Sequence, residues 1–295
     1  MFLFKILTEV RVKRLLTAFV IAGTATCAQA QTTENTLLWK VEGEDIKDAY
    51  LFGTIHLLPQ SEFELKSSVI EALDASETLV LELDMSDPAM QGKMMQKAPM
   101  KDGETLDKLL DEPTYQKLDK MLQESIGANV AFMNGWKPFI VSSFLIGRLI
   151  EGQPASFELS LVQAAKKREM PIVGLETLEE QMSIFDRIPY QSQADDLAEM
   201  VNEEEKIKNL YAEMVAAYKA ENLSRLYEML TEYMDDPKER DMMLGDRNRK
   251  WVPVFAEKAA DTKIFMGVGA GHLPGEDGMI ALVREAGYKV TAVKE

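Results

Sequence analysis

Histidine and cysteine are the scarcest chemically reactive residues in this chain of 295 residues. It has one cysteine, Cys27, and two histidines, His56 and His272. Imidazole is the commonest metal ligand in proteins and the usual general base near neutral pH. Because there are only two imidazoles, the sequence around each one is informative about function.

Positive charge and long apolar runs are also in short supply. The chain has 33 basic against 49 acidic residues and a formal net charge of -16, which argues against binding nucleic acid or anionic membranes by bulk electrostatics. The most apolar internal stretch, "FIVSSFLIGRLI" at 139–150, is too short to span a bilayer and contains Arg148. We therefore expect a core helix there. With 46% hydrophobic residues the chain is globular.

The first 30 residues have the pattern of a secretory signal peptide. A basic segment precedes the short apolar stretch 15–27, and "AQA" at 28–30 is a small-x-small cleavage site. We expect cleavage after Ala30 and a periplasmic or secreted protein, with residues 31–295 forming a single domain. Cleavage would remove Cys27, so the mature protein would have no disulfide, cysteine nucleophile or cysteine-ligated metal.

The remaining sequence alternates strand and helix patterns. Short apolar segments in 36–58, 78–84, 171–177, 263–275 and 288–294 predict strands. Helical periodicity dominates the middle of the chain, including 105–125 and about 178–260. This alternation predicts an α/β fold, with a central mixed β-sheet covered by helices and a large helical middle segment.

Both histidines lie in the same local context. "LFGTIHLLPQ" at 51–60 and "GVGAGHLPGE" at 267–276 each follow an apolar strand, and Gly53 and Gly269 stand three residues before His56 and His272. Functional sites gather at strand ends in α/β sheets, and glycine allows a sharp turn or a close approach. We expect the two imidazoles to converge on one site. The alternative is two buried histidines that are hydrogen-bonded in loops.

Carboxylates stand at two other predicted strand ends. Glu82 and Asp84 lie in "LVLELD", and Glu176 lies in "VGLET". Glu82 is flanked by leucines, and an acid within an apolar run needs a partner, although any one of these acids could simply be solvated. Two histidines and one glutamate form an established ligand set that leaves a position for water. The pattern predicts a divalent metal ion, and Mn, Co and Zn all remain possible.

A cluster of polar residues in "LGDRNRKW" at 244–251 adds Arg247 and Asn248 on a predicted helix. A solvated basic face is one interpretation. The other is an arginine that pairs with the site carboxylates or orients a substrate.

Two other classes of site are less well supported. "GVGAGHLPGEDG" stands between a strand and a helix, as phosphate-binding loops do, but it fits neither the dinucleotide nor the Walker pattern. A serine hydrolase is not supported, because Gly-x-Ser-x-Gly does not occur.

Five segments together resemble the TraB/GumN family, which includes the Tiki proteases. In chain order they are "YLFGTIHLLP", "TLVLELD", "MPIVGLETLEEQMSIFD", "LGDRNRKW" and "MGVGAGHLPGEDGMIALVREAGYKV". The resemblance covers most of the chain after about residue 36. It implies a compact α/β core shared with erythromycin-esterase-like and ChaN-like proteins.

The resemblance also implies metal-dependent hydrolysis, since Tiki members are metalloproteases. His56, His272 and Glu82 would form the metal and catalytic centre, with Glu82 as third ligand or general base, and Arg247 would orient the substrate. The supporting residues that it implies are Gly53, Gly269, Glu176, Asn248 and Glu158. We therefore expect an exported metal-dependent peptidase acting on a peptide or protein. The alternative is a non-catalytic periplasmic protein that binds a metal or ligand, as suggested by ChaN-like relatives.

Overall fold

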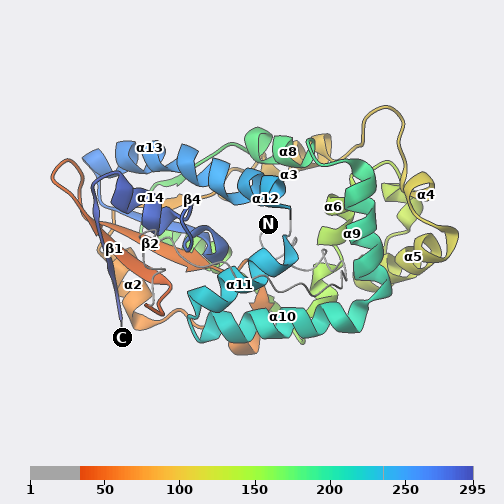
Figure 1. Ribbon diagram of the computed structural model, residues 1–295, viewed down its shortest axis with the longest axis horizontal. Coiled ribbons are helices and arrows are strands. Elements are labelled where there is room, and N and C mark those ends of the chain that lie inside the picture. Colours follow the sequence, from red (N-terminus) through yellow and green to blue (C-terminus); the bar gives the residue numbers. More distant parts are fainter. Residues whose placement is uncertain (1–33, 235, 295) are drawn as a thin grey trace, which may run out of the picture.

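The structure is a computed structural model that describes residues 34–234 and 236–294 (Figure 1). The predicted signal peptide, with Cys27 and the cleavage site after Ala30, lies outside the described residues. Within the described ranges no helix is both long enough and apolar enough to cross a bilayer.

A six-stranded mixed sheet organises one end of the molecule. Its strand order is β6-β4-β7-β2-β1-β8. The strands are β6 (Ile172–Gly174), β4 (Thr78–Leu81), β7 (Ile264–Gly269), β2 (Ala49–Thr54), β1 (Leu38–Glu42) and β8 (Lys289–Ala292). The first four run parallel, whereas β1 is antiparallel to both of its neighbours. The predicted mixed sheet is confirmed.

Burial on both faces explains the composition of the central strands. Every residue of β4 and β7 is buried, and both strands are nearly continuous apolar runs, as expected for parallel strands covered on both sides. In Figure 1, α13 (Asp246–Asp261) and α14 (Met279–Glu285) lie above the sheet and α2 (Ser67–Asp74) lies below it. The helix α7 (Phe157–Lys167) packs against β4.

The helical middle forms the other end of the molecule. Figure 1 shows α4, α5, α6 and α9 gathered there, while α10 runs along one edge back toward the sheet. These helices are α3 (Met90–Lys97), α4 (Leu106–Leu109), α5 (Glu112–Ile126), α6 (Pro138–Ser143), α8 (Leu178–Phe185), α9 (Tyr190–Asn202), α10 (Glu204–Lys219), α11 (Leu223–Tyr233) and α12 (Pro237–Arg240). One hydrophobic cluster runs from the strands into most of these helices, although not into α3 or α12. A second, smaller cluster consists of Leu83, Ala98, Ile140, Leu178 and Met182.

The apolar stretch 139–150 packs into the core as predicted, but it is not one helix. The helix α6 ends at Ser143, and a separate 3₁₀ turn covers Ile146–Leu149. Near the break, the hydroxyl of Ser142 donates to the carbonyl of Pro138 and that of Ser143 donates to the carbonyl of Ile140. Such side-chain bonds compete with regular helix bonding, which explains why the apolar pattern alone overestimated the helix length.

Candidate functional site

The predicted site residues meet at one edge of the sheet. The parallel strands β6, β4, β7 and β2 are adjacent in that order, and their carboxyl ends lead into Glu176, Glu82, His272 and His56 respectively. Carboxyl ends of parallel strands lie on the same edge, where ligands bind in open α/β sheets. Four segments that are distant in the sequence therefore present their polar side chains side by side.

Gly53 allows a close approach rather than making a turn. It lies inside β2, and a Cβ atom there would come within 2.8 Å of Leu273 Cδ1 and 3.1 Å of Ala270 Cα. These neighbours belong to the turn that carries His272. A side chain at position 53 would therefore push the two histidine segments apart, and the turn that the sequence suggested at Gly53 is wrong.

A glutamate on α7 holds His56 in place. Glu158 lies in the first turn of this helix, after the N-cap Ser156. Its Oε1 accepts hydrogen bonds from Thr54 Oγ1 at 2.6 Å and His56 Nδ1 at 2.8 Å, and its Oε2 accepts one from Ser156 at 3.0 Å. Burial acts to raise the pKa of Glu158, but the charge of His56 and these hydrogen bonds outweigh burial and lower the pKa to about 2.

The hydrogen bond to Glu158 decides which nitrogen of His56 carries the proton. An ionised carboxylate can only accept, so Nδ1 of His56 donates its hydrogen to Glu158. In the neutral ring, Nε2 then has a free lone pair. This atom is buried and has no hydrogen-bond partner within the described part of the chain. A carboxylate-oriented imidazole with an unoccupied Nε2 suits either a general base or a metal ligand.

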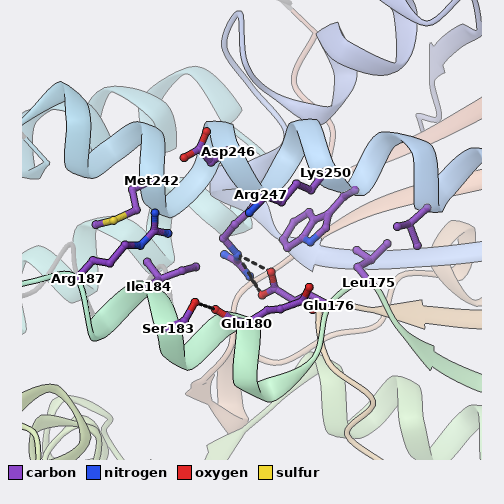
Figure 2. A pocket seen from close by; sticks show the side chains of 12 residues that line it. Leu175, Glu176, Glu180, Ser183, Ile184, Arg187, Met242, Asp246, Arg247 and Lys250 are labelled. Atoms are coloured by element: carbon purple, nitrogen blue, oxygen red, sulfur yellow. Dashed lines mark hydrogen bonds and ion pairs between the residues drawn. The ribbon is translucent and has the colours of Figure 1, made fainter. Parts of the chain in front are cut away.

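Arg247 links the ends of β6 and β4. It lies in the first turn of α13, directly after a π-helical segment, Asp241–Gly245, and only 3% of its side chain is exposed. Its Nη2 lies 2.6 Å from Glu176 Oε1 and its Nε lies 3.1 Å from the same oxygen (Figure 2). Its Nη2 also lies 2.6 Å from Glu82 Oε2. Of the two interpretations of "LGDRNRKW", pairing with the site carboxylates is the one found for Arg247.

The ion pairs shift the pKa values of Glu82 and Arg247. Burial acts to raise the pKa of Glu82, but the positive charge of Arg247 outweighs it, and the pKa lies well below its usual value. Glu82 Oε1 also accepts the amide hydrogen of Gly269 at 2.9 Å. Burial acts to lower the pKa of Arg247, but the two glutamates raise it. Two carboxylates and one guanidinium leave the group with a net negative charge.

His272 is held as a neutral imidazole. Asn248 donates from Nδ2 to the backbone carbonyls of His272 and Asp277, so its Oδ1 faces His272 Nδ1 at 2.7 Å. Arg247 Nη1 donates to His272 Nε2 at 2.9 Å. The proton is therefore on Nδ1. Burial, reinforced by the charge of Arg247, lowers the pKa of His272 to about 3.

The donor types suit a divalent ion, but their arrangement does not. Both histidines donate Nδ1–H to a protein oxygen, as metal-ligating histidines do, and His272 Nε2 lies 3.8 Å from Glu82 Oε1. However, Arg247 already occupies His272 Nε2. Across residues 34–234 and 236–294, no three histidine, cysteine, aspartate or glutamate side chains are grouped so that they could hold an ion. The residues thus do not fit a metal in this arrangement, and the ligand set His56, His272 and Glu82 stays a prediction.

Comparison with known proteins identifies the family. The sequence matches the TraB/PrgY/gumN family over residues 37–292. The chain belongs to the TraB/PrgY/gumN family. It is also similar to metalloprotease TIKI2 of Danio rerio. The two sequences are 21% identical over an alignment of 318 positions, which includes 88% of this chain and 61% of that protein. The chain thus spans less than two thirds of the length of this curated relative. No solved structure matches.

In this TraB/PrgY/gumN protein, four contact residues of the site were missed from the sequence. Thr54 was overlooked although it lies inside the Gly-x-x-His motif, and Trp251 although it follows Arg247 by four positions and so shares its helix face. The centre of the Trp251 ring lies 4.4 Å from Arg247 Cζ. Ser156, two residues before Glu158, and Gln181, whose Nε2 donates to Glu176 Oε1 at 2.9 Å, were missed as well.

Proposed function

We propose that this protein is a hydrolase that cleaves peptide amide bonds, with its reaction centre at the carboxyl ends of β2, β4, β6 and β7. Membership of the TraB/PrgY/gumN family and the similarity to a protein named a metalloprotease support hydrolysis. The single observation that carries the proposal is the free Nε2 of His56, backed by the ionised Glu158.

In this proposal His56 activates the attacking water once a local opening exposes its Nε2, which is buried in the structure. Its Nε2 accepts a proton from water as the oxygen attacks the carbonyl carbon of the substrate, and the imidazolium returns that proton to the leaving amine. Glu158 fixes the tautomer and stabilises the imidazolium while it exists. General acid–base catalysis of this kind typically contributes about 10²- to 10⁴-fold to the rate.

The side chain of Arg247 is fully engaged by the protein. All five N–H groups of Arg247 face protein acceptors, namely Glu82, Glu176, His272 Nε2 and the carbonyl of Met243. We therefore assign Arg247 the role of a positioning residue, in place of the contact with substrate that the family resemblance suggested. Asn248 positions His272 in the same way.

Export is a separate part of the proposal. It is supported by the leader at residues 1–30 and the small residues that end it. Mass spectrometry of the N-terminal peptide in a periplasmic extract tests it, and the expected first residue is Gln31. A chain that keeps the leader in all fractions contradicts export.

A peptide-pool assay tests the hydrolase proposal. Purified protein would be incubated with a diverse peptide pool in EDTA, Mn²⁺, Co²⁺ or Zn²⁺, and the products identified by mass spectrometry. We expect cleavage by the wild type, loss in His56→Gln and Glu158→Gln, and no loss in Glu205→Gln, a control glutamate whose side chain is 85% exposed.

The four assay conditions distinguish a metal-free reaction centre from one that needs a divalent ion. Cleavage in EDTA supports the centre as it stands in the structure, whereas cleavage only with added ions supports one in which His56, His272 and Glu82 hold a divalent metal. Tight metal binding with no cleavage in any arm contradicts the hydrolase and favours the non-catalytic binding protein.

A further inference from the structure

A cavity of about 270 Å³ lies between α8 and α13, beside the reaction centre (Figure 2). Arg247 and Glu176 form part of its wall, so the cavity and His272 lie next to the same guanidinium. The apolar part of its lining consists of Leu175, Ile184, Met242, Trp251 and Val254. The space suits one side chain or the end of a peptide.

Every acidic side chain in the lining is already engaged. Glu176 pairs with Arg247, and Asp246 Oδ1 accepts a hydrogen bond from Arg249 at 2.9 Å. Glu180 forms the capping box of α8, in which its Oε2 accepts from the backbone and hydroxyl of Thr177. These carboxylates therefore have protein donors of their own.

Two basic side chains in the lining are not engaged in this way. Arg187 and Lys250 are exposed, and the side chain of neither makes a hydrogen bond or an ion pair to any described residue. Lys250 acts on the Glu180 carboxylate only through its charge, where it adds to the hydrogen bonds that lower the pKa of that group. Figure 2 shows Arg187 reaching from the end of α8 toward α13, with Arg247 between it and Lys250.

The indole of Trp251 supplies a further unmet donor. Its Nε1 is buried and has no acceptor within the described chain, although buried polar groups normally have one. The same residue lines the cavity and packs against Arg247 and His272. Two basic side chains without a hydrogen-bond acceptor, and a tryptophan whose buried Nε1 also lacks one, thus line a cavity that has no free carboxylate.

We propose that this cavity is a subsite for a carboxylate of the substrate, bound by Arg187 and Lys250. The carboxylate belongs either to an acidic side chain or to the C-terminus of the peptide. The identification of the ligand as part of a peptide rests on the proposed function, but the binding itself does not require turnover. Hydrogen bonds between charged groups are the stronger class, and here no internal ion pair has to break to form them.

Three small probes distinguish the two sources of the carboxylate. N-acetyl-glutamate α-amide has only a side-chain carboxylate, N-acetyl-glutamine has only a C-terminal one, and N-acetyl-glutamine α-amide has none. Affinity would be measured by calorimetry on the full-length protein, and the indole N–H signal of Trp251 would be followed by NMR. We expect at least one carboxylate probe to bind about tenfold more tightly than the neutral probe and to shift the Trp251 signal.

Variants of the two basic residues complete the test. Arg187→Gln and Lys250→Gln should each weaken the preferred carboxylate probe about tenfold and leave the neutral probe unchanged. Lys258→Gln, also on α13 but paired with Glu257 outside this cavity, should change neither. Equal affinity for all three probes, or unchanged affinity in both variants, overturns the subsite. If the probes bind as expected while no peptide is cleaved, the proposed hydrolase fails and the subsite stands.

Discussion

Nη1 of Arg247 lies 2.9 Å from Nε2 of His272, while Nη2 of the same guanidinium binds Glu82 and Glu176. One side chain therefore connects the segments that follow β6, β4 and β7. It neutralises one of two buried carboxylates and occupies the imidazole nitrogen that would otherwise be free. The order of this part of the site depends on Arg247.

Replacing Arg247 should destabilise the fold strongly. Arg247→Met leaves two buried glutamates without their positively charged partner, and we expect the free energy of unfolding to fall by about 3–5 kcal/mol. Urea unfolding at pH 7 measures this change. The matched control is Arg249→Met, two positions along α13, where exposed ion pairs should contribute at most about 1 kcal/mol. Equal losses in the two variants contradict the role given to Arg247.

The same variant should acquire affinity for a divalent cation. Without the guanidinium, Glu82, Glu176 and His272 Nε2 face a vacated cationic position, and carboxylate and imidazole donors suit Mn²⁺ or Co²⁺. We expect either ion in large excess to raise the unfolding midpoint of Arg247→Met more than that of the wild type, because a ligand that binds only the folded state stabilises it. An equal or larger shift in the wild type shows that the native centre takes the metal with Arg247 in place.

His272 should stay neutral over the whole physiological pH range. Its pKa in the fold is about 3, against 6.5 for the free side chain, because burial and Arg247 disfavour its charge. The unfolded chain therefore binds a proton that the folded chain refuses, and this group makes the fold less stable as pH falls from 6.5 toward 3.

The histidine spectrum is simple because the chain has only two histidines. With ¹⁵N-labelled histidine, NMR should show that the ring of His272 has its proton on Nδ1 and does not titrate between pH 5 and 8. Asn248→Ala removes the acceptor of that proton and should change the tautomer signal. A His272 ring that titrates near 6.5 disagrees with the buried contacts described above.

Glu158 should contribute stability that acid removes. Its pKa is lowered from 4.5 to about 2, so its contribution is complete above pH 4.5 and is lost as pH falls through 2. The shift corresponds to at most about 3 kcal/mol at pH 7, because part of it comes from a positive charge that His56 carries only when it is protonated. Glu158→Gln should be less stable than the wild type by up to that amount at pH 7, and the difference should shrink at pH 3. Glu205→Gln is the control, and an equal deficit at both pH values would show that packing rather than charge is responsible.

The sequence revealed those parts of the fold that local patterns encode. Apolar runs such as those in β4 and β7 predicted buried strands, and the two Gly-x-x-His motifs placed imidazoles at strand ends. The sequence did not predict where the helix in 139–150 ends. Hydrogen bonds from the hydroxyls of Ser142 and Ser143 to backbone carbonyls accompany the end of this helix, while the apolar pattern continues beyond it.

The contacts of the site needed tertiary structure. Arg247 is 165 residues from Glu82 and 71 from Glu176 in the chain, and no local pattern specifies that pairing. The same holds for His56 and Glu158, which are brought together by the pairing of β3 (Leu58–Pro59) with β5 (Pro154–Ala155) next to them. Family resemblance pointed to these residues, but only the fold gives their hydrogen bonds and their protonation.

The central claim is that His56 activates water for hydrolysis. The measurement that tests it most directly is kcat/KM of His56→Gln on a peptide that the wild type cleaves, with the unfolding free energy of both proteins determined in parallel. The account predicts a loss of at least about 100-fold in kcat/KM with the variant still folded. A folded His56→Gln protein that keeps the wild-type kcat/KM would contradict it.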